Sequence, residues 1–463
     1  MGGAMRDQLE AMRAFHRSGA TRPALFRLDA LARLRDCLKK RENDIAAALQ
    51  ADLGKVAGEA YLTETGLVLG EISLLRRKLP AYMRPRQAGG RFGGFGGGVA
   101  LFPSRCLVRP EPLGLALIMA PWNYPVHLSL LPLADAIAAG NCVALKPSSR
   151  APACAGLIAE IAAECFRAEH VSVFSGEGES LGNELLRERW DFIFYTGSGR
   201  VGREVLAAAA PHLTPVCLEL GGKSPAIVCA DADLKLAARR IAWGKMLNAG
   251  QTCVAPDYVL AHASVKSRLV EYLQQEFERF PGRGRAALDN PDYCRIVSVA
   301  ALERLLELSG GQAEYDRQSL RLAPLLLPDA RPEDAVMREE IFGPLLPLLE
   351  FDSQEDAISF VNNRDKPLAS YIFTSSGQNA EFFLENISSG GACVNDTVLQ
   401  VAAHYLPFGG VGASGMGRYH GRHGFELFSH LKSVVKRGTW CDPTLRYLPV
   451  KALAFRLVRR FLS

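Results

Sequence analysis

The chain has 463 residues, of which 22% are charged and 48% hydrophobic, and its formal net charge is +5. A chain of this length and ordinary globular composition predicts two or three domains rather than one core. Four of the positive charges lie beyond residue 446 with no acid beside them, so the rest of the chain carries about +1. This balance excludes the basic footprint of a nucleic-acid-binding protein.

The cysteines and histidines indicate a protein with reduced thiols and no metal site. The eleven cysteines are scattered, form no CxxC pair and are odd in number, as expected of a cytoplasmic chain. The nine histidines have no zinc-binding spacing. The N-terminus lacks an apolar signal region. No stretch reaches the roughly 18 apolar residues that a membrane-spanning helix requires.

The first 82 residues are predicted to be helical. Leucines recur at helical spacing through residues 28–38, and a further helical pattern ends near Pro80. Seven of the ten residues in 89–98 are glycine. A flexible loop is favoured there over a phosphate-binding turn, because no strand precedes the glycines and no helical pattern follows them.

From residue 113 the pattern alternates between short apolar strands and helices. The expected strands are 115–120, 142–145, 171–174, 191–195 and 216–220, and the expected helices are 129–139, 154–166 and 201–210. Such alternation predicts βαβ units and a parallel sheet. Parallel sheets of this kind bind ligands at the carboxyl ends of their strands.

A second α/β region follows residue 222. Its expected strands are 226–229, 258–261, 323–327, 347–351 and 370–373, and its expected helices are 234–246, 265–280, 300–308 and 353–363. The chain then passes through a glycine-rich stretch at 407–417 and ends in a basic tail. The fold class predicted by this order is α/β, with two parallel-sheet domains.

Residues 197–202 spell GxGxxG between a predicted strand and a predicted helix. Glycines at such a junction let backbone N–H groups approach a pyrophosphate at the helix N-terminus. The acid that usually binds ribose about 20 residues further on is missing in its usual form. By itself the motif is a weak indication of dinucleotide binding.

Three further stretches carry candidate chemistry. Asn123 stands between two prolines after the first strand, where its amide can donate to an oxyanion or simply serve a turn. Lys146 ends the next strand. Cys253 lies 34 residues after Glu219, and taken alone such a cysteine is more often a small core residue than a nucleophile.

Together these stretches resemble the aldehyde dehydrogenase superfamily, and most closely its class 3 branch. The matching segments occur in the family's order over most of the chain and read PWNYP, LKPS, YTGSGRVG, LELGGKSP, GQTCVAPDY, EEIFGP and LPFGGVGASGMGRYHG. The resemblance implies a Rossmann-like cofactor domain, a second α/β catalytic domain and a small β oligomerisation arm. It implies domain limits of 1–83 with 107–218, 219–396 and 84–106 with 397–440, followed by a tail at 441–463.

The resemblance also implies roles for individual residues. Cys253 resembles the nucleophile, Glu219 the general base and Asn123 the oxyanion donor. The residues that it places at NAD or NADP are Trp122, Lys146, Ser149, Gly197, Ser198, Gly202, Glu340 and Phe342. Those that it places at the aldehyde are Tyr61, Tyr124, Thr397 and His404, although each is as easily a core residue.

The implied reaction is oxidation of an aliphatic or aromatic aldehyde to a carboxylic acid by a homodimer. Cys253 forms a thiohemiacetal and then a thioester, which water activated by Glu219 hydrolyses. Glu219 argues against a coenzyme A-acylating or reductive relative, because relatives that pass the acyl group to coenzyme A lack that base. The intact set of site residues argues against a catalytically silent relative.

Two features depart from the common pattern. Ser149 stands three residues after Lys146, where the family often has a glutamate that repels the 2′-phosphate of NADP, so use of both cofactors is expected. In the tail 447–463, apolar residues share one helical face and basic residues lie off it. This pattern fits packing on the body or a dimer partner, and equally peripheral contact with an anionic membrane.

Overall fold

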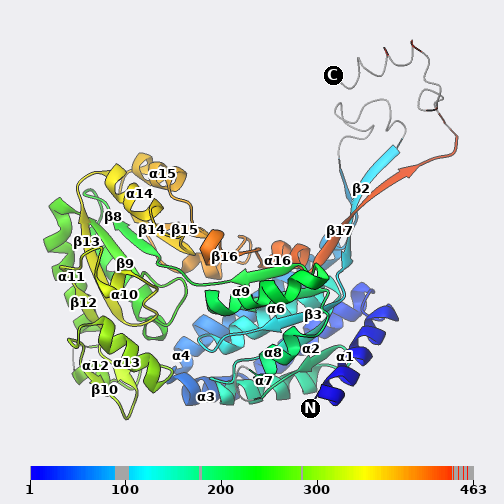
Figure 1. Cartoon of the computed structure of the whole chain (residues 1–463), viewed down its shortest axis with the longest axis horizontal. Helices are drawn as coiled ribbons and strands as arrows, with labels where there is room; N and C mark the ends of the chain where they lie inside the picture. Colours follow the sequence, from blue (N-terminus) through cyan, green and yellow to red (C-terminus); the bar gives the residue numbers. More distant parts are fainter. Residues whose placement is uncertain are drawn as a thin grey trace.

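Two α/β domains lie next to each other, and a β-arm projects from one of them (Figure 1). The structure, a computed structural model, describes residues 2–88, 104–176, 180–282 and 285–440, together with Asp442, Tyr447, Ala452 and Arg456. The glycine-rich loop expected at 89–98 lies outside the described residues, as does most of the tail at 447–463. None of the helices among the described residues is long and apolar enough to cross a membrane.

The first domain, which the resemblance expects to bind the cofactor and which is called the cofactor domain below, is built on a six-stranded sheet with the order β16-β7-β6-β3-β4-β5. Five strands are parallel, and only the two-residue β16 runs antiparallel, against β7. Strands β3 and β6 are buried along their whole length, as expected where helices cover both faces of a parallel sheet. The strands are β16 Gly415–Met416, β7 Val216–Glu219, β6 Phe192–Thr196, β3 Leu115–Met119, β4 Cys142–Lys146 and β5 Val171–Val173.

Helices cover this sheet, and α1 packs against β3 and β4, while α2, α3 and α5 pack on α6 and α7. The helices are α1 Gly2–Arg17, α2 Ala24–Lys40, α3 Glu42–Leu53, α4 Ala57–Ala60, α5 Gly66–Tyr82, α6 Pro125–Ala139, α7 Pro152–Cys165, α8 Ser180–Leu186 and α9 Gly199–Ala209. A π-helical turn, η1 Tyr61–Thr65, joins α4 to α5.

Helix α6 is entirely buried and sets the position of the loop that precedes it. Pro125 begins the helix, where its missing N–H costs nothing. Gly140 ends it in the left-handed conformation at φ 96°. The buried guanidinium of Arg27 then donates to the carbonyl oxygens of Ala138 and Ala139 at 3.0 and 2.8 Å. Both ends of α6 are therefore fixed.

The catalytic domain contains a second six-stranded sheet, which is parallel throughout and has the order β12-β13-β9-β8-β14-β15. Its strands are β12 Leu325–Leu327, β13 Leu345–Phe351, β9 Tyr258–His262, β8 Pro225–Val228, β14 Ala369–Phe373 and β15 Gly391–Val394. Its helices are α10 Leu234–Met246, α11 Lys266–Arg279, α12 Arg285–Asp289, α13 Val299–Leu308, α14 Gln354–Asn362 and α15 Gly377–Asn386. A small antiparallel pair, β10 Tyr315–Asp316 and β11 Arg321–Leu322, lies outside this sheet.

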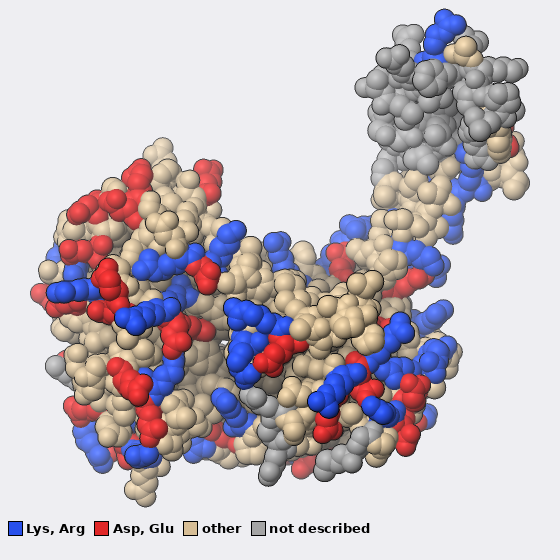
Figure 2. Space-filling model, viewed as in Figure 1, with Lys and Arg blue, Asp and Glu red and all other residues tan. Residues whose placement is uncertain are grey.

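The arm is a three-stranded antiparallel sheet of β1 Arg86–Gln87, β2 Ser104–Pro112 and β17 Ser429–Arg437. Strand β2 continues to Pro112, so the boundary expected at residues 106/107 falls inside it. Helix α16 Gly421–Leu427 precedes β17 and packs on α5 and α6 of the cofactor domain. Basic and acidic side chains are mixed over both domains on the face drawn in Figure 2.

Candidate active site

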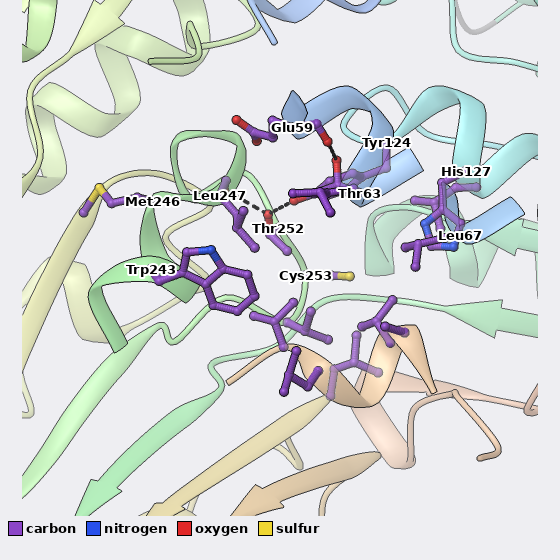
Figure 3. A pocket seen from close by; sticks show the side chains of 18 of the residues that line it. Glu59, Thr63, Leu67, Tyr124, His127, Trp243, Met246, Leu247, Thr252 and Cys253 are labelled. Atoms are coloured by element: carbon purple, nitrogen blue, oxygen red, sulfur yellow. Dashed lines mark hydrogen bonds between the residues drawn. The ribbon is translucent and has the colours of Figure 1, made fainter. Parts of the chain in front are cut away.

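A cavity of about 840 Å³ lies between the two domains and is lined by residues from both. The thiol of Cys253 points into this cavity, with Trp243 on one side and Leu67 and His127 on the other (Figure 3). Glu219 and Tyr124 also line it. The structure therefore brings the expected nucleophile and the expected base to one cavity.

The backbone just before Cys253 is bent sharply. Asn248, Ala249 and Gly250 are consecutive residues with positive φ, at 51°, 50° and 75°. Only Gly250 adopts this conformation without steric cost, so the other two store strain. A Cβ at position 250 would lie 2.3 Å from the carbonyl oxygen of Gly343, so glycine is also required there for space.

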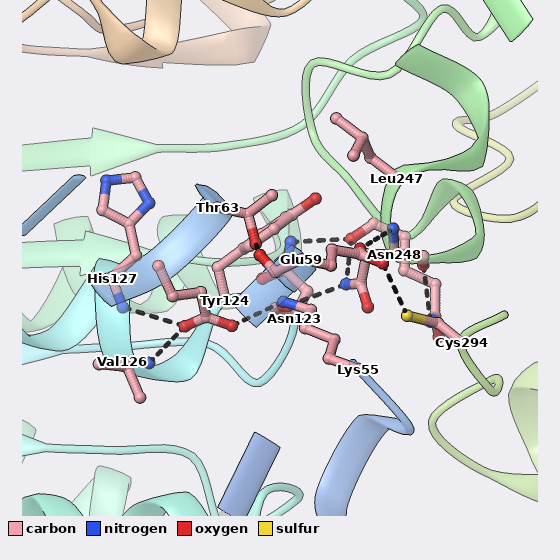
Figure 4. A network of polar contacts seen from close by, with 12 residues as sticks. Lys55, Glu59, Thr63, Asn123, Tyr124, Val126, His127, Leu247, Asn248 and Cys294 are labelled. Atoms are coloured by element: carbon pink, nitrogen blue, oxygen red, sulfur yellow. Dashed lines mark hydrogen bonds and ion pairs between the residues drawn. The ribbon is translucent and has the colours of Figure 1, made fainter. Parts of the chain in front are cut away.

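Hydrogen bonds from both domains hold this strained loop (Figure 4). The Asn248 backbone N–H donates to Glu59 at 2.7 Å, and the Asn248 side chain donates to the carbonyl oxygen of Asn123 at 2.8 Å. The Gln251 side chain donates to the Arg295 carbonyl at 2.9 Å and accepts from the Val297 N–H at 3.0 Å. These bonds offset the strain.

A buried ion pair supports the other side of the loop. Lys55 and Glu64 are both fully buried, with 2.6 Å between Nζ and Oε1. Lys55 also donates to the carbonyl oxygen of Asn123 at 3.0 Å. The second Glu64 oxygen accepts from the N–H groups of Val126 and His127, in the first turn of α6. Burial raises the pKa of Glu64, and Lys55 and these N–H groups oppose that shift.

Asn123 is buried, and its side-chain Nδ2 donates to the carbonyl oxygen of Gln251 at 3.1 Å. Gln251 is two residues before Cys253, so this bond holds the Asn123 amide close to the cysteine. The second N–H of the amide is left for another acceptor. The neighbouring Tyr124 hydroxyl lies 2.5 Å from Thr252 Oγ1. Both residues of the loop after β3 are thus bonded to the loop 247–254 of the other domain, which carries the expected nucleophile and is called the nucleophile loop below.

Glu219 is the last residue of β7, paired with Thr196 of β6 and with Gly415 of β16. The expected base therefore belongs to the cofactor sheet, whereas the sequence placed the domain boundary just before it. Its carboxyl is buried; Oε1 accepts from the Cys217 thiol at 3.6 Å, and Oε2 has no hydrogen-bond partner among the described residues. Burial raises the pKa of Glu219 well above its usual value.

Burial also acts against the thiolate form of Cys253. It raises the pKa of Cys253 to about 12, and the nearby carboxyls of Glu340 and Glu219 act in the same direction. Hydrogen bonds from the backbone N–H groups of Cys253 and Val254 oppose the shift. The backbone of the loop is thus what favours the thiolate in this position.

The expected cofactor residues of the first domain lie at the carboxyl edge of its sheet. Lys146 ends β4, and burial lowers the pKa of its amine. Ser149 is exposed three residues later. Ser198 caps α9 by accepting from the Val201 N–H at 3.4 Å, while a Cβ on Gly197 would lie 2.3 Å from the Tyr195 hydroxyl oxygen.

Gly202 lies in the first turns of α9, close to the chain that follows β7. A Cβ at this position would lie 3.0 Å from a methyl group of Leu220. This glycine therefore permits close packing of α9 against the chain after β7, which is the part that the third glycine of such a motif takes.

The second domain contributes the loop from Glu339 to Pro344. Glu340 is enclosed by the chain: a Cβ on Gly221 would lie 1.9 Å from its Oε2, and its Oε1 has no hydrogen-bond partner among the described residues. Burial raises the pKa of Glu340 to about 8. Phe342, at φ 53°, meets the Trp122 ring edge-to-face at 5.5 Å across the two domains.

These residues fit a dinucleotide. The first sheet presents Lys146, Gly197 and the N-terminus of α9 along one edge. The second domain adds the unpartnered oxygen of Glu340, which can accept from a ribose hydroxyl. Ion-paired Lys223 and Asp257 anchor that loop, because Lys223 donates to the Glu339 carbonyl at 2.9 Å.

Of the four expected aldehyde residues, only Tyr124 lines the cavity. Tyr61 is 44% exposed on η1, while the next two residues on that turn, Leu62 and Thr63, line the wall. Thr397 is buried and donates to the Arg240 carbonyl at 2.8 Å. His404 lies 2.9 Å from the buried Glu71 carboxyl, which also accepts from the Gly421 N–H. The latter two are therefore placed as structural residues.

The sequence missed most of the apolar wall. Helix α10 contributes Trp243 and Met246, and the 3-10 turn η7 Leu399–Ala402 contributes three of its four residues. Trp243 is 45% exposed although it is large and apolar. The only indication of this wall in the sequence was Trp243 itself, a large aromatic residue on an outer face of the helix just before the nucleophile loop. The η7 residues follow no periodic pattern and offered none.

The fold and these side chains define the class of protein. It is an α/β oxidoreductase with a nucleotide-binding sheet, a second parallel sheet and a cysteine in the cavity between them.

The chain belongs to the aldehyde dehydrogenase family, whose profile matches residues 5–434. It is 42% identical over 452 residues to aldehyde dehydrogenase family 3 member A2 of Rattus norvegicus, which covers 96% of this chain and 91% of the relative. It is 42% identical over 454 residues to the dimeric NADP-preferring aldehyde dehydrogenase of Canis lupus familiaris, covering 96% and 97%. The solved substrate-bound state of Staphylococcus aureus AldH superimposes with a TM-score of 0.93 at 38% identity, covering 99% of both chains.

The Lys55–Glu64 pair gives a test of how the site is held together. Replacing Lys55 by Met leaves the Glu64 carboxylate buried without its partner, so the free energy of unfolding should fall by about 3–5 kcal/mol. Denaturant unfolding of the purified protein measures this change. As a control, Lys40→Met removes an exposed partner of Glu164 at 3.1 Å and should cost less than about 1 kcal/mol. Equal losses in the two variants would contradict the assigned role of the buried pair.

Proposed function

We propose that the protein oxidises apolar aldehydes to carboxylic acids with NAD or NADP, using Cys253 as nucleophile and Glu219 as general base. The observation that carries this proposal is the convergence of the Cys253 thiol and the Glu219 carboxyl on one cavity, with Asn123 bonded to the loop behind the thiol. Membership of the aldehyde dehydrogenase family supports the reaction class.

The side chains supply each function that the reaction needs. The Cys253 thiolate adds to the aldehyde carbon, and the new oxyanion is stabilised by the Asn123 amide and the Cys253 backbone N–H. Bound NAD or NADP supplies the hydride acceptor. The thioester left on Cys253 is attacked by water, whose proton Glu219 takes. The carbon–sulfur bond then breaks, the carboxylate leaves and the thiolate is restored.

The cavity supports an apolar substrate. Its wall is built largely from aliphatic and aromatic side chains of α10, η1 and η7. A cavity of this size and character accommodates a medium or long aliphatic chain or an aromatic ring. The similarity to Staphylococcus aureus 4,4'-diaponeurosporen-aldehyde dehydrogenase, at 39% identity over 458 residues, agrees with a large apolar aldehyde.

The two catalytic groups predict the pH dependence of turnover. Both act in the deprotonated form, and burial raises both pKa values. Turnover should therefore increase as the pH rises above neutral, which steady-state formation of NAD(P)H measures.

Substitutions separate the two groups. Glu219→Gln should retain a single burst of NAD(P)H and lose about a hundredfold or more in steady-state rate, because only thioester hydrolysis needs the base. Cys253→Ala should lose the burst as well. Undiminished aldehyde-dependent NAD(P)H formation in Cys253→Ala would refute the nucleophile, and product formation that requires coenzyme A would favour the acylating alternative.

We propose that NADP is accepted as well as NAD, because Ser149 is uncharged and exposed three residues after Lys146. Ser149→Glu should lower kcat/KM with NADP by about 10–100-fold through repulsion of the 2′-phosphate. The variant should change kcat/KM with NAD by only a few fold. A wild-type preference for NAD above about a thousandfold, or roughly 4 kcal/mol, would contradict the proposal.

We propose that the protein is a cytoplasmic homodimer assembled through the arm. Strand β17 pairs with β2 along its full length, and Leu431 and Val435 on it are 37% and 57% exposed. A projecting three-stranded sheet with exposed apolar residues is suited to packing against a second copy of the chain. The similarity to the dimeric canine aldehyde dehydrogenase supports this assembly.

A chain ending at residue 446 separates the two roles expected for the tail. Light scattering should show whether the dimer mass survives, and sedimentation with anionic vesicles should show whether binding is lost. Loss of vesicle binding alone identifies peripheral membrane contact, whereas loss of the dimer alone identifies packing.

A further inference from the structure

The turn η7 forms part of the cavity wall, and the side chain of Gln400 bonds it to the protein interior. Leu399, Val401 and Ala402 line the cavity. Gln400, between them, is only 9% exposed and is bonded in the interior. The preceding Val398 has φ 65°, a conformation that β-branched residues rarely adopt. The turn therefore needs its interior bonds to keep its shape.

The partner of Gln400 is Tyr371, a fully buried residue of β14. Gln400 Nε2 donates to the Tyr371 hydroxyl at 3.2 Å. The Gln400 Oε1 atom accepts from the thiol of Cys393 at 2.9 Å, and Cys393 is the residue paired with Tyr371 across β14 and β15. The amide of Gln400 is thus oriented by one bond at each of its ends.

Tyr371 in turn bonds to the nucleophile loop. Its hydroxyl donates to the carbonyl oxygen of Val254, the residue after Cys253. Val254 is buried, with only 2% of the residue exposed. If the Tyr371 hydroxyl were removed, bulk water could not take its place as the donor to the Val254 carbonyl. The N–H of Val254 faces the Cys253 sulfur and favours its thiolate. The orientation of residue 254 therefore affects the thiol directly.

We propose that Tyr371 and Gln400 are positioning residues that hold the Cys253 loop for attack and couple it to the cavity wall at η7. A long aldehyde chain that contacts Leu399 and Val401 then stabilises the same bonds that orient the nucleophile, whereas a short aldehyde does not reach them. This inference deepens the proposed function and rests on Cys253 as the nucleophile. No part of the proposed reaction uses either residue as an acid, a base or a direct contact of the reacting atoms.

The test compares two buried tyrosines. Tyr371→Phe removes the donor to Val254. Tyr293→Phe is the matched control, because the Tyr293 hydroxyl is equally buried and donates to the Leu322 carbonyl at 3.1 Å, in another part of the domain. Two properties are measured: the rate at which iodoacetamide alkylates Cys253 as a function of pH, with the site identified by peptide mass, and kcat and KM for an aliphatic aldehyde.

Tyr371→Phe should slow alkylation at a given pH and reduce kcat by about tenfold each, the effect of one buried hydrogen bond. The alkylation profile should shift to higher pH, and KM should change less than kcat. The Tyr293→Phe control should match the wild type within about twofold in both assays. If the two variants behave alike in alkylation and kcat, the positioning role is overturned.

A second variant keeps the inference testable if Tyr371→Phe does not fold. Gln400→Leu preserves the volume of the side chain and removes its bonds to Tyr371 and Cys393. The ratio of kcat/KM for a long-chain aldehyde to that for a short-chain aldehyde should fall by about fivefold, since only the long chain contacts η7. An unchanged ratio overturns the coupling.

Failure of this inference is distinct from failure of the proposed function. Persistent aldehyde oxidation in Cys253→Ala would remove the nucleophile itself. Wild-type oxidation that depends on Cys253, together with normal alkylation in Tyr371→Phe, would remove only the positioning role.

Discussion

The carbonyl oxygen of Asn123 is the point on which the active site depends. It accepts from Lys55 at 3.0 Å and from the Asn248 side chain at 2.8 Å, so one atom joins the loop after β3 to the loop that carries the nucleophile. The side chain of the same residue donates back to Gln251. Two of these three bonds at Asn123 cross between the two domains. They fix the backbone whose N–H groups face the Cys253 sulfur.

This arrangement explains why strain is tolerated next to the nucleophile. Two non-glycine residues with positive φ would relax in a free loop. Here Glu59 and Asn123 accept hydrogen bonds from Asn248, and the Gln251 amide is bonded through both its nitrogen and its oxygen. The buried Lys55–Glu64 pair supports the same loop, because Lys55 donates to the Asn123 carbonyl. Geometry at Cys253 is consequently a property of the whole interface between the domains, and a substitution far from the thiol can alter it.

The sequence predicted the elements that depend on local patterns. The parallel strands of both sheets except β15, together with helix α10, were found within a few residues, because continuous apolar runs and helical periodicity reflect burial on sheets and helices. The sequence did not predict β15. The placement of Cys253, Glu219 and Asn123 near one another followed from a resemblance to a family. Periodicity carries no information about contacts between residues 130 apart, and it gave no account of why Lys55 or Tyr371 is needed.

Contacts made by single side chains were beyond the sequence. Thr397 and His404 stand in stretches that match the family, yet Thr397 donates to the Arg240 carbonyl and His404 lies beside the Glu71 carboxyl, away from the cavity. Tyr61 differs from the wall residues Leu62 and Thr63 by one or two positions on a π-helical turn, a geometry that no composition rule anticipates. Gly202 fits a nucleotide motif and serves helix packing. The sequence motifs thus predicted where the active site lies, but they did not predict which way each side chain points.

The position of Glu219 at the end of β7 has a mechanical consequence. The base is carried by the sheet that also carries Lys146 and the α9 terminus, whereas the thiol belongs to the neighbouring domain. A small rotation of one domain on the other would leave the spacing between base and cofactor edge unchanged and alter the spacing between base and thioester. In the proposed reaction, hydride transfer and thioester hydrolysis both need groups of the first domain beside the Cys253 thiol, so both steps depend on the interdomain bonds at Asn123.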